Sequence, residues 1–137
     1  MAFNEKLEIN DPGQMSPLNL AFVGDVVYSL LVRTRLVAEG NRPTHALNKA
    51  SSAQVCAVRQ SKDYYRLLPH LQDDEVAVLK RGRNANPSQK AKNASFAEYR
   101  NATGLEALFG YLYLKGENCR IIELFNICWS GDEDETK

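Results

Sequence analysis

The sequence predicts an all-α fold, and three observations carry that prediction. The apolar segments are long and lack the alternation of apolar and polar residues that marks strands. Their boundaries carry residues that begin and end helices, such as the Ser16-Pro17 pair and Gly40. Neither Asn-Gly hairpin signals nor internal repeats occur. These features exclude an architecture built on a sheet.

The first expected helix runs from Leu18 to about Glu39. Ser16 can cap it, and Pro17 suits the first helical position because its missing N–H has no partner there. Gly40 is suited to end it. Apolar residues occupy nearly every face of this segment, and such a pattern predicts a central helix.

A second expected helix begins at Pro43-Thr44 and continues to Leu68. An apolar stripe follows one side of it and polar residues follow the other. Pro69 ends or kinks this helix because proline cannot continue the helical hydrogen bonds. The pattern predicts a helix that packs on the core through one face.

A short helix is expected to begin with the three acidic residues at 73–75, whose negative charge suits the positive end of a helix dipole. Its last turn is basic, and Gly82 is the expected stop. Residues 84–93 have turn chemistry throughout and predict an exposed loop.

Two helices are expected in the last third of the chain. Ser95 and Glu98 form an S-x-x-E capping box, which opens a helix that ends near Gly116. The final helix, at 118–129, is expected to pack back on the others. The acidic residues beyond it predict a frayed end.

The length of 137 residues fits one domain. We expect a core at about 16–129, a polar arm at 1–15 and an acidic tail at 130–137. The three cysteines are scattered without metal-binding spacing, which argues against a disulfide framework and a zinc cluster. No segment is apolar enough to span a membrane, and no leader is recognisable, so a cytoplasmic protein is expected.

Two carboxylates lie within otherwise apolar helices: Asp25 in LNLAFVGDVVYSLLV and Glu106 in ATGLEALFGYLYL. Neither has a basic residue three or four positions away, so nothing local offsets a buried negative charge. Two such acids that meet in space would form an oxygen site for Mg²⁺ or Mn²⁺. Taken singly, a buried Asp can instead cap a neighbouring helix, and a lone Glu can point at solvent.

Glycines accompany both acids. Gly24 precedes Asp25, and Gly104 and Gly110 flank Glu106. Each costs about 1 kcal/mol of helix propensity relative to Ala. Small residues here would let two helices approach closely and bring the carboxylates together, or they would merely relieve crowding in the core.

The segment LAFVGDVVYSLLVR resembles the signature helix of ribonuclease III nuclease domains, and ATGLEALFGYLYL resembles their second motif. The intervening LKRGRNA and the short length are similar to Mini-ribonuclease III, the branch that consists of the nuclease domain alone. The resemblance spans roughly residues 16 to 125. It implies an all-helical homodimeric endonuclease that cuts double-stranded RNA with Mg²⁺ and matures large-subunit ribosomal RNA precursors.

The resemblance also implies roles for single residues. Asp25 and Glu106 match the metal-binding and catalytic acids of the two motifs. Ala21 and Thr103 stand where most of the family has further acids, which puts a second metal ion in doubt. Phe22 matches the aromatic residue that inserts into the partner subunit, although a Phe on an apolar helix more often packs in its own core.

A nuclease domain without a separate binding domain must hold its own substrate. The acid-free basic segment at residues 80–92 is our candidate reader of A-form RNA, which offers phosphates and 2′-hydroxyls more readily than base edges. A solvated surface loop is the alternative. The candidate RNA-binding residues are Lys80, Arg81, Arg83, Asn84, Lys90 and Lys92, with Gln89 as a further hydrogen-bonding group.

The sequence leaves two other functions open. One is an RNA-binding module that rides on ribosomal RNA and has lost catalysis, which Ala21 and Thr103 favour and the two acids oppose. The other is a helical protein-interaction domain, which leaves the acid-free basic segment unexplained.

Overall fold

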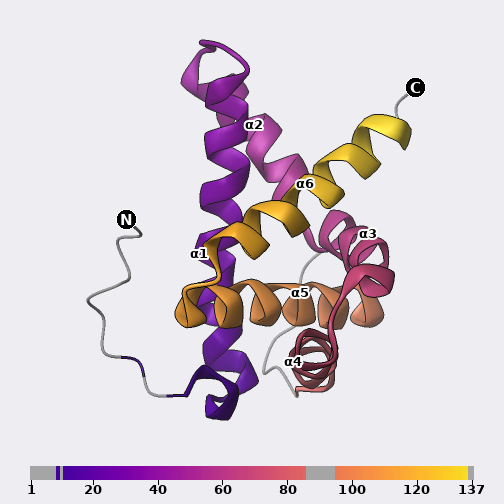
Figure 1. Cartoon of the computed structure of the whole chain (residues 1–137). Helices are drawn as coiled ribbons and strands as arrows, with labels where there is room; N and C mark the ends of the chain where they lie inside the picture. The colour runs from indigo at the N-terminus through magenta and orange to yellow at the C-terminus, as the bar shows by residue number, and fades with distance from the viewer. Residues whose placement is uncertain (1–8, 10, 86–94, 136–137) are drawn as a thin grey trace.

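Two long helices cross at the centre of the molecule, and the other helices pack around them (Figure 1). The computed structural model describes residues 9, 11–85 and 95–135, and all regular structure within these ranges is helical. This confirms the all-α prediction. The elements are η1 (Pro12–Gln14), α1 (Pro17–Ala38), α2 (Thr44–Val55), α3 (Ala57–Leu67), η2 (Leu68–His70), α4 (Asp73–Asn84), α5 (Phe96–Lys115) and α6 (Asn118–Glu135).

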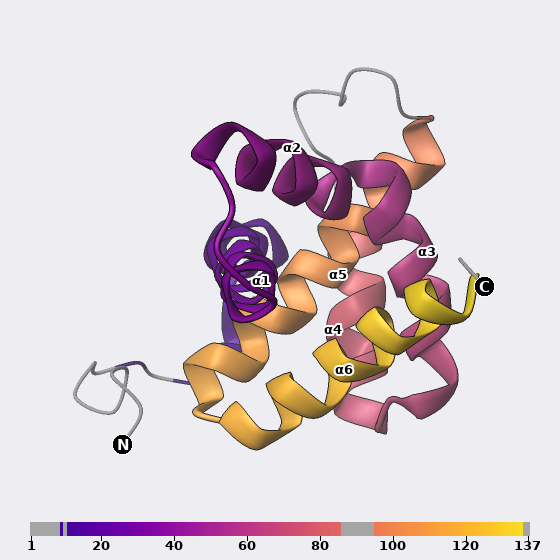
Figure 2. The same ribbon diagram turned by 90° about the horizontal axis from the view of Figure 1, so that it is seen from above.

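Helix α1 begins and ends close to the predicted residues. Pro17 occupies its first turn, and the chain leaves the helix through Gly40, whose φ of 141° lies in the region that favours glycine. Viewed along its axis, α1 lies beside α2 and α5, and α5 passes between α1 and α4 (Figure 2). The central position predicted for α1 is therefore confirmed.

The prediction of one helix from Thr44 to Leu68 is wrong, because the structure has two. The chain breaks at Cys56, whose backbone is extended at φ −71° and ψ 156°. Helix α2 packs on α1, whereas α3 packs on α5, so the break turns the chain from one central helix to the other. No glycine or proline marks this turn, and tertiary packing sets it.

Helix α4 begins at Asp73 as expected, but it does not stop at Gly82. It continues to Asn84, and Gly82 is buried where α4 meets α5. A Cβ on Gly82 would lie 2.7 Å from the Cβ of Ala107 and 2.9 Å from the Cα of Gly104. Gly82 therefore permits a close helix contact rather than ending a helix. Most of the predicted loop at 84–93 lies outside the described residues.

The capping box that opens α5 is confirmed. The backbone N–H of Glu98 donates to Ser95 Oγ at 3.1 Å, and the backbone N–H of Ser95 donates to Glu98 Oε1 at 3.0 Å. Gly116 ends α5 in the left-handed conformation, at φ 78°. Helix α6 continues to Glu135, past the end predicted at residue 129.

The core lies between α1, α5 and the helices on either side of them. The Tyr28 ring packs edge-on against Phe109 at 5.4 Å and Phe125 at 5.9 Å between centroids. The Tyr28 hydroxyl donates to Asp63, a fully buried carboxylate that also accepts a hydrogen bond from Arg66 at 2.8 Å.

In the described part of the chain, no helix is long and apolar enough to cross a membrane.

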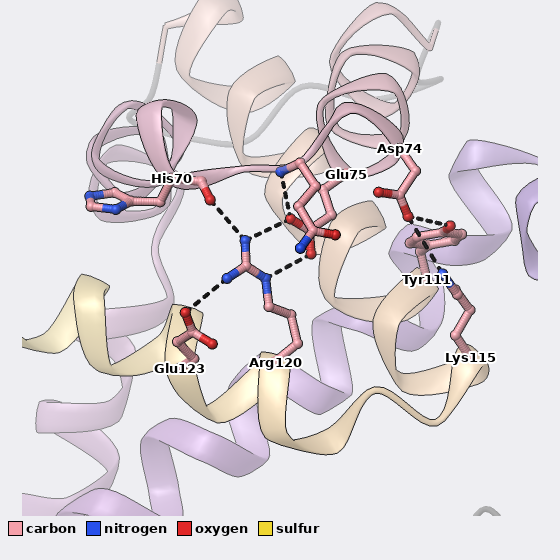
Figure 3. A network of polar contacts seen from close by, with 8 residues as sticks. His70, Asp74, Glu75, Tyr111, Lys115, Arg120 and Glu123 are labelled. Atoms are coloured by element: carbon pink, nitrogen blue, oxygen red, sulfur yellow. Dashed lines mark hydrogen bonds and ion pairs between the residues drawn. The ribbon is translucent and has the colours of Figure 1, made fainter.

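A polar cluster at one end of the core joins α4, η2 and α6 (Figure 3). Arg120 of α6 donates to both carboxylate oxygens of Glu75, at 2.8 and 2.9 Å, and to the carbonyl of His70 at 2.8 Å. Glu75 is 2 % exposed and also accepts the N–H of Gln72 at the start of α4. A buried carboxylate is tolerated when it is paired and fully hydrogen-bonded, as Glu75 is.

Replacement of Arg120 by Ala should therefore lower the free energy of unfolding by about 3 kcal/mol or more, because it leaves Glu75 charged and buried without its main partner. Glu123→Gln is the matched control, since it removes only the exposed contact of the same guanidinium, worth about 0 to 1 kcal/mol. Urea denaturation of the two variants measures the difference. Equal losses would contradict the importance of the buried pair.

Candidate active site

The backbones of α1 and α5 touch where the two sequence motifs meet. A Cβ on Gly24 would lie 1.6 Å from the carbonyl oxygen of Glu106, and a Cβ on Gly110 would lie 1.9 Å from that of Leu20. No larger residue fits at either glycine without separating the helices. Of the two interpretations of these glycines, close helix approach is the one the structure supports.

Gly104 serves a different contact from the other two glycines. Its missing Cβ would lie 2.6 Å from the carbonyl oxygen of Leu79 in α4, so Gly104 and Gly82 together form the crossing of α4 and α5. One face of α5 is thus fitted to α1 and another to α4. The position of Glu106 on α5 is fixed from both sides.

The crossing brings the carboxyl groups of Asp25 and Glu106 into hydrogen-bonding contact. Burial, the hydrogen bond to Asp25 and the negative charge of Asp25 together raise the pKa of Glu106 to about 9. At neutral pH the Glu106 carboxyl therefore holds its proton unless a cation takes the place of that proton. The pair is therefore a site that favours added positive charge.

The two acids differ in their exposure, and the expectation that both are buried is wrong for Asp25. Asp25 is exposed, whereas Glu106 is partly buried. The apolar neighbours of Asp25 on α1 are themselves at the surface, with Phe22 81 % and Val26 67 % exposed. Asp25 thus faces solvent from the rim of the site, and Glu106 lies behind it.

Gln60 is a member of the site that the sequence analysis missed. It lies on α3, is 3 % exposed and hydrogen-bonds the Glu106 carboxyl, which lowers the pKa of Glu106. The neighbouring Ser61 accepts a hydrogen bond from Asn101 of α5 at 3.0 Å, which holds α3 in place beside the acid. No local pattern separates Gln60 from the surface glutamines of other helices, because its burial results from the break at Cys56.

The two positions that lack family acids contribute nothing to the carboxylate pair. Ala21 is buried in α1. Thr103 is 6 % exposed, and its hydroxyl donates to the carbonyl of Tyr99 one turn earlier in the same helix, at 3.1 Å. Among the described residues, no group of three or more His, Cys, Asp or Glu side chains is arranged to hold a metal ion. The site consists of two carboxylates supported by an amide.

The predicted RNA-binding residues divide into three groups. Lys80 is exposed on α4. Arg81 donates to the carbonyl oxygens of Gly13 and Met15, at 3.0 and 3.2 Å, and so holds the N-terminal turn on α4. Arg83 donates to the side chains of Asn101, at 3.1 Å, and Asn84, at 3.2 Å. Lys90 and Lys92 lie outside the described residues, as does Gln89.

Comparison with known proteins identifies the family. The model of the Ribonuclease III domain matches residues 18–117, a range that contains both acids and the crossing between them. The chain belongs to the ribonuclease III family. Its closely similar relatives are Mini-ribonuclease 3 proteins, so it falls in the branch that the sequence motifs indicated.

The Mini-ribonuclease 3 of Brevibacillus brevis is 44 % identical over 92 % of this chain and 94 % of its own length. That of a Thermoanaerobacter species is 42 % identical over 82 % of this chain and 80 % of its own. A crystal structure of a Fusobacterium nucleatum protein matches with a TM-score of 0.79 and 31 % identity, covering 90 % of this chain and 99 % of the other. The chain is thus a ribonuclease III family endoribonuclease of the Mini-ribonuclease 3 type.

The raised pKa of Glu106 links this site to stability. Between the ordinary pKa of 4.5 and about 9, the folded protein holds a proton that the unfolded chain has released. The free energy of unfolding must then fall as pH rises through this range, because the folded state binds more protons than the unfolded state.

In EDTA, the wild type should lose stability between about pH 5 and pH 9, and Glu106→Gln should lose less, since all other titrating groups are common to both. Urea denaturation at a series of pH values measures the two slopes. Identical slopes would show that Glu106 ionises normally in the folded protein.

Proposed function

We propose that this chain is a Mg²⁺-dependent endonuclease of double-stranded RNA, with Asp25 and Glu106 as its catalytic metal ligands. The observation that carries the proposal is the contact between these two carboxyl groups where α1 crosses α5. The products of this hydrolysis would carry 5′-phosphate and 3′-hydroxyl ends. Mn²⁺ would substitute for Mg²⁺, since both favour oxygen ligands.

The donor set fits such a cation. Both acids offer carboxylate oxygens, the ligands that Mg²⁺ prefers, and the exposure of Asp25 leaves room for the waters that Mg²⁺ keeps. Burial and the nearby Asp25 both raise the pKa of Glu106, and a divalent cation would stabilise its ionised form against both effects. With Ala21 and Thr103 buried, these residues support one cation better than two.

The cation, when bound, lowers the pKa of water and acts as a Lewis acid at the phosphate. The side chains of the protein prepare that site. Glu106 gives up its proton when the cation binds, so metal affinity should rise with pH. The hydrogen bond from Gln60 favours the ionised form of Glu106 and fixes its direction. Asp25 faces the solvent, from which the phosphodiester approaches.

We also propose that the protein acts as a homodimer joined through α1. Phe22, Val26 and Leu30 form an exposed apolar stripe, and beside it lies a hollow of about 430 Å³. Phe22 lines this hollow and is 81 % exposed, so a twofold axis could place each Phe22 against the hollow of the other copy. The two sites of a dimer would then cut the two strands of one duplex. The hollow is lined by Phe22, Val23, Val26, Val27, Leu30, Leu31, Tyr113, Asn118, Ile121 and Ile122.

The RNA would be held in part by the basic segment. Lys80 is exposed and available for phosphate contact. Lys90 and Lys92 remain candidates for RNA binding on the basis of the sequence alone. Arg81, Arg83 and Asn84 would contribute only if they exchanged their present hydrogen bonds for RNA. The proposed substrate is a precursor of large-subunit ribosomal RNA, on the basis of the family resemblance. The proposed location is the cytoplasm.

Asp25→Asn and Glu106→Gln should each reduce cleavage of an RNA duplex by at least a hundredfold in Mg²⁺, because each removes charge from the cation site while keeping its shape. Asp73→Asn, an exposed acid on α4, is the control and should cleave normally. Gel assays of a labelled duplex measure the rates. A folded Asp25→Asn variant that cuts at the wild-type rate would overturn the site assignment.

Phe22→Ala should shift the protein from dimer to monomer, because the anchor of the interface is lost. Tyr65→Ala removes another exposed aromatic, 61 % exposed on α3, and should leave the dimer intact. Sedimentation velocity at micromolar concentration separates the two species. A wild-type monomer, or a Phe22→Ala dimer of unchanged affinity, would refute this interface.

A further inference from the structure

The arginines of this chain differ in whether they donate hydrogen bonds to other residues of the chain. There are nine, and all lie in the described part of the structure. Four donate to carboxylates of the chain, and four donate to its amide or carbonyl oxygens. Among the described residues, none accepts a hydrogen bond from Arg33 or pairs with its charge. Arg33 is exposed, and its guanidinium is free to bind an anion.

Arg33 shares a groove with the catalytic carboxylate. A hollow of about 360 Å³ on α1 is lined by Asp25, Val26, Ser29, Leu30 and Arg33. Asp25, Ser29 and Arg33 follow one another at intervals of four residues, so they lie along one face of the helix. Eight residues of helix place the backbone of Arg33 about 12 Å from that of Asp25. This distance is too long for an ion pair but short enough for one RNA strand to contact both residues.

We infer that Ser29 and Arg33 bind the RNA backbone beside the scissile phosphate, on the same strand. The inference rests on the proposed function, and it adds a second binding site, on α1, to the basic segment at residues 80–92. A guanidinium suits this role because its fork of N–H groups matches two phosphate oxygens at once. The Ser29 hydroxyl, partly buried in the groove, would donate to a phosphate or 2′-hydroxyl between the two charges.

The charges along the groove agree with cation binding at Asp25 and phosphate contact at Arg33. The carboxyl pair of Asp25 and Glu106 offers phosphate no positive charge until a cation binds, so it alone would not attract RNA. Arg33 supplies fixed positive charge two turns away, outside the carboxylate pair. It also lines a second hollow of about 220 Å³ between α1 and α2, where the exposed Thr44 and Asn48 offer further hydrogen-bonding groups. A strand that leaves the site along α1 would meet these groups in turn.

The test measures binding rather than cleavage. In an Asp25→Asn background, which keeps the duplex intact, the affinity for a labelled RNA duplex is measured over a range of salt concentrations. Arg33→Gln should weaken binding and reduce the slope of log affinity against log salt by about one, as expected for one lost phosphate contact. Arg33→Lys should keep the slope but bind less tightly than the parent, because it loses the paired geometry.

Lys115→Gln is the matched control, because it removes one positive charge near the end of α5, where Lys115 pairs with Asp74. It should leave the slope unchanged. Unaltered affinity and slope in Arg33→Gln, or an equal loss in Lys115→Gln, would overturn the inference, as would loss of the dimer in Arg33→Gln. An Asp25→Asn variant that still cleaves defeats the proposed catalytic site, while the slope still decides the role of Arg33.

Discussion

The contact between the backbones of α1 and α5 is the constraint on which the rest of the structure depends. At Gly24 and Gly110 the two helices leave no room for a Cβ, so their separation is set by main-chain atoms and not by side chains. Side-chain packing tolerates small adjustments, but a main-chain contact does not. The two carboxyl groups are therefore held together by main-chain contacts, a fixed geometry that suits the proposed cation site.

The crossing also contributes to the raised pKa of Glu106. Burial is the main cause of the shift to about 9, and the crossing adds to it by holding the Glu106 carboxyl against Asp25. Gln60 of α3 opposes this rise in pKa through its hydrogen bond to Glu106, and the hydrogen bond between Asn101 and Ser61 holds α3 in place. A divalent ion at the proposed site would have to displace the proton of Glu106, so its binding would depend on pH.

The sequence predicted those features that local chemistry decides. The caps at Ser95 and Gly116 and the proline at the start of α1 are properties of a few adjacent residues, and each was located correctly. The break at Cys56 and the burial of Gly82 were not predicted, because each depends on a helix distant in sequence. Gln60 was missed for the same reason. The roles of Arg81 and Arg83 likewise depend on Met15 and Asn101, which no reading of residues 80–92 could reveal.

The exposure of Asp25 shows how an apolar pattern can mislead. Helix α1 is apolar on nearly every face, and this normally indicates complete burial. The structure divides those faces instead. Leu20, Tyr28 and Val32 pack in the core, whereas Phe22, Val26 and Leu30 face outward.

A polar edge lies beside the outward stripe on α1 and carries Asp25, Ser29 and Arg33. One helix therefore carries the core, the surface proposed for the second copy and the groove proposed for RNA. Any substitution that rotates α1 by a fraction of a turn would disturb all three at once. The glycine crossing fixes that rotation, and it therefore sets the position of all three surfaces.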